Sequence, residues 1–120
     1  MMTIIKIDKP LMVSEIKKTF SDRFPYLKIE FFKNKHKNLE GSLKKDLITT
    51  DFEIKATQKD NSIVFSETML VSELEQQFAE KLKLSAQIFR KSGRTWLETT
   101  YTDSWSLEKQ NEEGLALSKI

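Results

Sequence analysis

Basic and aromatic side chains gather at two places in the chain, and these are the groups best suited to bind another molecule. The first cluster closes an expected strand and consists of Phe32, Lys33, Lys35, His36 and Lys37. The second cluster lies in the other half of the chain and consists of Arg90, Lys91, Arg94 and Trp96. Basic side chains bind phosphates, and exposed aromatic rings stack on unpaired bases or anchor a protein partner. We therefore predict that both clusters are binding residues.

The net charge and its distribution indicate which kind of partner these clusters would bind. A net charge of +2 is small for a nucleic-acid-binding protein, although residues 1–60 carry a mild basic excess. Lysines at strand ends also have a simpler interpretation, because they prevent edge-to-edge pairing of sheets. The pattern indicates a basic corner of the molecule and places protein contact ahead of nucleic acid.

Motifs for catalysis and for cofactor binding are absent from the sequence. His36 is the only histidine and cysteine is missing, so a metal site would depend on carboxylates alone. The three glycines lie too far apart for a phosphate-binding loop, and no G-x-S-x-G nucleophile elbow occurs. Asp51 and Glu53 share one side of an expected strand, which is the arrangement of a solvated strand face. We expect a protein that is not an enzyme and holds no cofactor.

The composition is typical of a folded domain. Of 120 residues, 38% are hydrophobic and 32% are charged, which is enough for a core, and the length fits one domain over residues 1–120. No apolar run approaches the ~18–20 residues of a membrane span, and the first residues lack the pattern of a signal peptide. With cysteine absent, these features predict a soluble, cytoplasmic protein without a membrane partner.

The two halves of the chain resemble each other. Residues 12–24 align with residues 70–82, a shift of 58 positions. Four of the aligned pairs are identical: Val13/Val71, Ser14/Ser72, Glu15/Glu73 and Phe20/Phe78. Any two amphipathic helices agree at apolar positions, but these two also agree at polar ones. We interpret the pattern as two pseudo-repeats, over about 3–57 and 61–119, related by an approximate twofold axis.

The periodicity of hydrophobic residues predicts the helices and strands on which the two basic and aromatic clusters lie. It predicts helices at about 13–23 and 70–82 and strands at 3–8, 26–33, 51–57, 62–67, 85–91 and 94–101. We expect 51–57 and 62–67 to pair as a hairpin. A short helix over 105–113 is expected to end at Gly114, with a last strand at 115–117.

These elements predict an α+β fold in which two helices pack on one face of a mixed sheet. A ferredoxin-like split β-α-β arrangement suits the repeat best, and a β-grasp arrangement is the alternative. Neither fold defines a function. We expect a non-catalytic protein-interaction module, possible partners being a second copy or another protein, that makes contact through strand edges and exposed aromatic residues. The alternative is single-stranded nucleic-acid binding through the basic and aromatic strand ends. A small-molecule site between the halves has no residue to support it.

Overall fold

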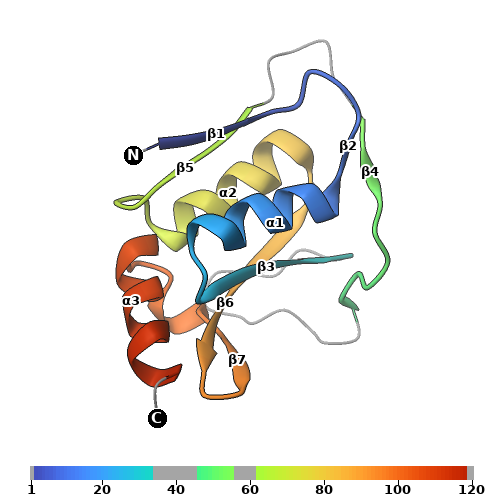
Figure 1. The fold of residues 1–120 in the computed structure, drawn as a ribbon. Coiled ribbons are helices and arrows are strands. Elements are labelled where there is room, and N and C mark those ends of the chain that lie inside the picture. The colour runs from blue at the N-terminus through green and yellow to red at the C-terminus, as the bar shows by residue number, and fades with distance from the viewer. Residues whose placement is uncertain (1, 34–45, 56–61, 119–120) are drawn as a thin grey trace.

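Seven strands and three α-helices make up the part of the chain that the computed structural model describes, residues 2–33, 46–55 and 62–118 (Figure 1). The strands are β1 (Met2–Lys6), β2 (Leu11–Met12), β3 (Leu27–Phe32), β4 (Glu53–Ile54), β5 (Ser62–Ser66), β6 (Ser85–Ser92) and β7 (Thr95–Glu98). The helices are α1 (Val13–Arg23), α2 (Val71–Leu82) and α3 (Leu107–Ser118), with a short 3₁₀ helix, η2 (Thr100–Thr102), after β7. The predicted α+β class is confirmed, and the described residues form one compact domain.

The described strands form three antiparallel sheets: β1–β5, β2–β4 and β3–β6–β7. In Figure 1 the β1–β5 ribbon lies on one side of α1 and α2, and the β3–β6–β7 sheet lies on the other. The prediction of a single mixed sheet is therefore wrong. The predicted hairpin between 51–57 and 62–67 is also wrong, because β4 pairs with β2 and β5 pairs with β1. Ferredoxin-like and β-grasp folds both need one continuous sheet, which these strands do not form.

The helices lie between two β layers because apolar side chains leave them toward both. The ring of Phe20 packs against Phe65 of β5, with 5.5 Å between centroids, and the ring of Phe78 packs against Phe31 of β3 at 5.3 Å. Four apolar residues of these helices are fully buried, namely Ile16, Phe20, Leu74 and Phe78. If each helix is assumed to have a single apolar face, one sheet is enough to cover both helices. The sequence pattern therefore did not predict the second β layer.

The helices α1 and α2 begin in the same way. A carboxylate oxygen of Glu15 accepts the backbone N–H of Met12 at 3.1 Å, and a carboxylate oxygen of Glu73 accepts the N–H of Leu70 at 2.8 Å. Each glutamate is the third residue of its helix, so each satisfies a donor that the first helical turn cannot. The residues that perform this capping occupy equivalent positions in the two aligned segments.

Strand pairing has a related regularity. Ile5 of β1 pairs with Ile63 of β5, which lies 58 positions further along the chain. In the other layer Ile29 pairs with Ile88, and Glu30 pairs with Gln87. Shifted by 58 positions, residues 27–32 of β3 become residues 85–90, the segment of β6 with which β3 pairs. In both layers, therefore, a strand of one half pairs with the equivalent strand of the other half.

The last helix differs from its prediction. α3 runs to Ser118, so Gly114 lies inside it and the strand expected at 115–117 is wrong. Gly114 is buried against Tyr26, where a Cβ would have no room. The glycine is thus required by close packing and not by a helix end. None of the helices in the described ranges is both long enough and apolar enough to cross a membrane.

Candidate functional site

The first predicted cluster contributes one exposed residue to the described surface. Phe32 is only 4% exposed, because residues 46–48 run along the outer edge of β3 and Phe32 bridges to Leu47. The N–H of Lys33 donates to the carbonyl of Asp46 at 2.9 Å, and the side chain of Lys33 is exposed. The ring of Phe32 is therefore not available to a partner. Lys35, His36 and Lys37 lie outside the described residues.

The second cluster is divided between the two faces of β6. Arg90 points toward α3, where its Nη1 donates to Oε1 of Gln110 at 3.0 Å. Its guanidinium carbon also lies 5.6 Å from the centre of the Trp105 ring. Lys91, the next residue, points to the opposite face, as neighbouring residues of a strand do. Arg90 thus fixes α3 to the sheet and is separated from Lys91 and Trp96.

On the outer face of the β3–β6–β7 sheet, four side chains come together that we call the lysine–tryptophan face: Lys28, Phe89, Lys91 and Trp96. Lys28 is directly opposite Phe89, and Lys91 is directly opposite Trp96. The Nζ of Lys28 lies 5.1 Å from the Trp96 ring centre and 5.4 Å from that of Phe89. The Nζ of Lys91 lies 5.3 Å from the Trp96 ring centre. The indole therefore lies within cation–π distance of two ammonium groups.

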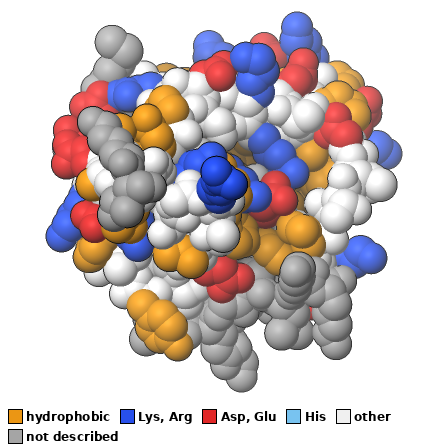
Figure 2. All heavy atoms as spheres, turned by 60° about the horizontal axis from the view of Figure 1, so that its bottom comes forward, with side chains coloured by type: hydrophobic (Ala, Val, Ile, Leu, Met, Phe, Trp, Pro, Cys, Tyr) orange, Lys and Arg blue, Asp and Glu red, His pale blue; other side chains and the backbone are white. Residues whose placement is uncertain are grey.

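The charges on this face are only partly compensated. Within the described residues Lys28, Lys91 and the exposed Arg94 form no ion pair, whereas Glu30 is paired with Lys17 at 3.0 Å. Glu98, opposite Phe89, is the acidic neighbour on β7. Figure 2 turns this side of the molecule forward and shows Lys and Arg side chains next to hydrophobic ones near its middle. The face combines a half-buried tryptophan with unpaired cations, which is suited to a partner that carries carboxylates or phosphates.

Sequence reasoning found part of this face and missed the rest. It selected Lys91, Arg94 and Trp96 but not Lys28 or Phe89. The alternation of β3, in which Leu27 and Ile29 point to the core, already places Lys28 on the outer side. The register that brings Lys28 beside Phe89 joins segments about 60 residues apart, and periodicity alone does not supply it.

A partly buried carboxyl group, that of Glu75, is a second feature that the sequence did not predict. Glu75 follows Val71 by four residues and so shares the buried side of α2. One of its carboxylate oxygens accepts the N–H of Ile88 at 2.9 Å. Burial raises the pKa of Glu75 to about 8, with smaller contributions from the charges of Asp103 and Glu98, while the Ile88 hydrogen bond lowers it. The carboxyl group completes the hydrogen bonding of β6 beyond the end of β7.

Raised pKa values occur at catalytic sites, but they occur in structural positions as well. Glu75 has no histidine, cysteine or second carboxylate bonded to it among the described residues, and the pocket described next does not include it. The described residues also contain no group of three His, Cys, Asp or Glu side chains that could hold a metal ion. Glu75 is therefore best understood as a structural group.

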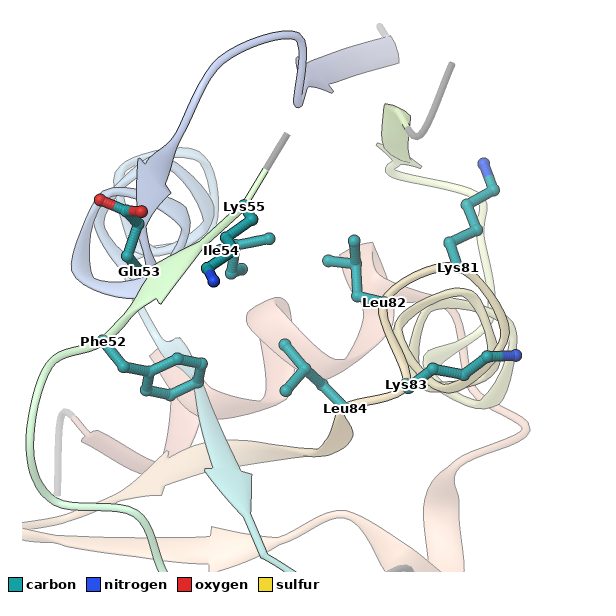
Figure 3. Close-up of a pocket in the computed structure, with 8 residues that line it drawn as sticks. All are labelled: Phe52, Glu53, Ile54, Lys55, Lys81, Leu82, Lys83 and Leu84. Atoms are coloured by element: carbon teal, nitrogen blue, oxygen red, sulfur yellow. The ribbon is translucent and has the colours of Figure 1, made fainter. Parts of the chain in front are cut away.

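A pocket of about 330 Å³ lies between β4 and the end of α2. Figure 3 shows the apolar side chains that face one another across it, those of Phe52, Ile54, Leu82 and Leu84. The ammonium groups of Lys81 and Lys83 point away from this opening (Figure 3). Ligand sites combine apolar walls with a few convergent polar groups. This pocket has the volume of such a site, and the polar groups among its described lining residues are the charged side chains of Glu53, Lys55, Lys81 and Lys83.

Asp51 has a capping role. Its carboxylate accepts the N–H of Ser14 at 2.9 Å and the Ser14 hydroxyl at 2.6 Å. The hydroxyl hydrogen bond is the main cause that lowers the pKa of Asp51, and the N–H bonds of Ser14 and Phe52 add to it. An anion at the first turn of α1 also opposes the positive end of the helix dipole. These contacts explain the position of Asp51 without a catalytic role.

Comparisons with models of known protein families, with characterised proteins and with solved structures give no match to this chain.

Proposed function

We propose that this protein is a non-catalytic protein-interaction module whose docking surface is the lysine–tryptophan face. The observation that carries the proposal is the position of Trp96. Its ring is only partly exposed and lies close to both Lys28 and Lys91 on a sheet face that ends in the basic β6–β7 turn. Tryptophan and arginine are enriched among the residues that dominate binding energy at protein interfaces. A tryptophan already ordered by its neighbours loses little conformational freedom when it is covered.

The chemistry of the face indicates an acidic partner. Covering Lys28 and Lys91 removes water from two ammonium groups, and this is favourable only if the partner supplies carboxylates in return. Carboxylates above the two lysines would leave the edge of the indole free to contact an apolar side chain. The partner we expect therefore presents acidic residues on either side of one apolar residue.

Single-stranded nucleic acid is the second candidate, and a specific observation favours it. Two aromatic rings, Phe89 and Trp96, share one sheet face with Lys28 and Lys91, which form no ion pair among the described residues. Sheet-borne aromatic rings with nearby cations are the usual platform for stacking unpaired bases. Against this candidate, two ammonium groups already lie 5.1 and 5.3 Å from the centre of the indole, and a stacked base would compete with them. We therefore rank nucleic acid below an acidic protein.

We also propose that the module is an internal duplication of residues 3–57 and 61–119. The identical helix caps of Glu15 and Glu73 support it, as does the pairing of equivalent strands, β1 with β5 and β3 with β6. In a duplicated domain the second repeat is free to acquire a contact that the first repeat lacks. The lysine–tryptophan face is asymmetric in this sense, because both of its rings come from the second half.

The test uses two defined polyanionic probes. One is a peptide that alternates glutamate with leucine, and the other is a thymidine oligonucleotide of the same length. Isothermal titration at about 50 mM salt measures the affinity of the whole chain for each. The Trp96→Ala variant removes the central ring, and the Tyr101→Ala variant is the matched control, since Tyr101 is 87% exposed and lies off the face.

The proposal predicts that the peptide binds and that Trp96→Ala weakens its affinity about tenfold or more, the effect of removing a central interface tryptophan. Tyr101→Ala should leave the affinity unchanged. Tighter binding of the oligonucleotide than of the peptide, with a steep loss toward about 200 mM salt, would replace the first candidate by the second. Binding of neither probe would overturn both.

A further inference from the structure

One edge of the β1–β5 ribbon is closed and the other is open. At the outer edge of β5, the side-chain amide of Gln77 takes the place of a neighbouring strand. Its Oε1 accepts the N–H of Val64 at 3.0 Å, and its Nε2 donates to the carbonyl of Val64 at 2.6 Å. At the other side of the ribbon, β1 pairs with β5 and with no other strand of the described chain.

The position of Gln77 also defines which backbone groups of β1 are open. Val64 is directly opposite Ile4, and the N–H and carbonyl of Val64 point away from β1, toward Gln77. In an antiparallel ladder, opposite residues turn their groups either toward each other or both outward. The N–H and carbonyl of Ile4 therefore point outward, away from β5. The same alternation turns the backbone groups of Met2 and Lys6 outward.

The outer face of this strand is apolar as well as open. Met2 is 62% exposed and Ile4 is 53% exposed, and both belong to the few large hydrophobic residues exposed in the described chain. Val64, opposite Ile4, continues the patch onto β5. A two-stranded ribbon is marginal in isolation, and an unprotected edge beside exposed apolar side chains is a site where another strand adds.

We propose that a second copy of this chain adds to the β1 edge, with the two β1 strands antiparallel about a twofold axis at Ile4. In this register Ile4 pairs with Ile4 of the second copy, and Met2 pairs with Lys6 of the second copy. All outward backbone groups of both strands are then used. The product is a four-stranded sheet in the order β5–β1–β1–β5, with Met2, Ile4 and Val64 of both copies on one face.

Two features indicate that the strand added to β1 belongs to a second copy of this chain: the positions of the charged side chains in the contact, and the outer edges of the resulting sheet. The register places each Lys6 opposite a methionine, so the two Lys6 side chains lie at opposite ends of the contact and do not repel each other directly. Because the amide of Gln77 occupies the outward N–H and carbonyl of Val64 in each copy, the β5 edges of the four-stranded sheet are blocked at their centre and growth stops at two copies. A contact of one five-residue strand from each copy is small, so the dimer is weak, with a Kd in the micromolar range or above.

β7, an edge strand of the β3–β6–β7 sheet, does not offer the same contact. It has only four residues and carries Glu98 within it, with Arg94 just before it. Short, charged edges are the ordinary protection against strand addition. The exposed Leu97 of β7 therefore provides a matched control for Ile4.

Sedimentation velocity of the full chain over about 1–200 μM tests the proposal, a range that brackets a micromolar Kd. The wild-type sedimentation coefficient should rise with concentration. Ile4→Lys and Ile4→Glu should each be monomeric throughout, because two like charges would face each other on the twofold axis. Leu97→Lys should associate as the wild type does, and so should Trp96→Ala, which separates this contact from the lysine–tryptophan face.

A mixture of Ile4→Lys and Ile4→Glu gives the sharpest result. Opposite charges then face each other at the axis, so the mixture should form a 1:1 heterodimer although neither variant associates alone. Circular dichroism spectra that match the wild type establish that both variants are folded, as expected for an exposed position. A wild type that stays monomeric at every concentration, an Ile4→Lys variant that still dimerises, or a mixture that fails to associate would each overturn the proposal.

Discussion

Gly114 of α3 lies so close to Tyr26 that a Cβ on the glycine would be 2.8 Å from the Cβ of the tyrosine and 3.0 Å from its carbonyl oxygen. Neither of these atoms is at the flexible end of a side chain, so neither can move aside without moving backbone. The contact joins the C-terminal helix to the residue just before β3. Asn111, one turn earlier in α3, strengthens the same junction by accepting the Tyr26 N–H at 2.9 Å.

Gly114→Ala should lower the free energy of unfolding by about 1–3 kcal/mol, the usual cost of overpacking. Alanine is the better helix former by about 1 kcal/mol, so propensity and packing act in opposite directions at this position. Chemical denaturation measures which dominates. The matched control is Ala116→Gly, at an exposed position of the same helix, which should cost about 1 kcal/mol by propensity alone. A Gly114→Ala variant more stable than the wild type would show that α3 does not pack on Tyr26.

The raised pKa of Glu75 predicts a dependence of stability on pH. The unfolded chain releases the Glu75 proton near its ordinary pKa of 4.5, but the folded chain holds it until about pH 8. Between these values the folded state binds more protons than the unfolded state, so the free energy of unfolding falls as pH rises. The Glu75 contribution is fully present below about pH 4.5 and is lost by about pH 8, a change of order 2–4 kcal/mol.

Glu75→Gln isolates this contribution, because the amide oxygen can still accept the Ile88 N–H but cannot ionise. Urea denaturation across pH 4–8.5, compared between the two proteins, cancels the titration of all other groups. The variant should equal the wild type near pH 4 and exceed it progressively toward pH 8. A difference that does not change with pH would contradict the burial of this carboxyl group.

Phe78→Ala should lower the free energy of unfolding by about 3–5 kcal/mol, because it leaves a cavity between α2 and the ring of Phe31. Gln76→Ala, on the exposed side of the same helix, should change stability by less than about 0.5 kcal/mol. The two variants are compared by thermal and urea unfolding. A cost below about 1 kcal/mol for Phe78→Ala would be incompatible with a fully buried ring.

Lys83 ends α2 in the left-handed conformation, with φ at 56°. Within the described residues it is the non-glycine residue with a positive φ, at a helix position where glycine is preferred. Lys83→Gly should therefore raise the free energy of unfolding by roughly 0.5–1 kcal/mol. Lys81→Gly, inside the last turn of the same helix, should instead lower it by about 1 kcal/mol. Loss of stability in both variants would contradict the left-handed conformation at Lys83.

The sequence predicted the elements that local periodicity determines. The helix over Val13–Arg23 has the predicted bounds, and the Phe20 and Phe78 positions are buried as their spacing required. It failed where the pairing of distant segments decides the structure. Nothing local distinguishes β5 pairing with β1 from β5 pairing with β4, since the side chains of either neighbour would alternate in the same way.

The same limit applies to the candidate surface. Trp96 was recognisable from its neighbours, but its two lysine neighbours come from different strands, and only the β3–β6–β7 register brings Lys28 over it. Phe32 was expected beside the basic residues on the surface, and residues 46–48 cover it instead. A local pattern does not show which later segment will cover a strand edge.

An amide and indole chemical-shift titration tests whether a partner binds to the lysine–tryptophan face. The ¹⁵N-labelled chain is titrated with the glutamate–leucine peptide. We expect shifts for the Trp96 indole N–H and for the amides of Lys28, Phe89 and Lys91, with the Trp105 indole and the β1 amides unaffected. Shifts confined to other residues, or none at saturating peptide, would contradict binding at this face.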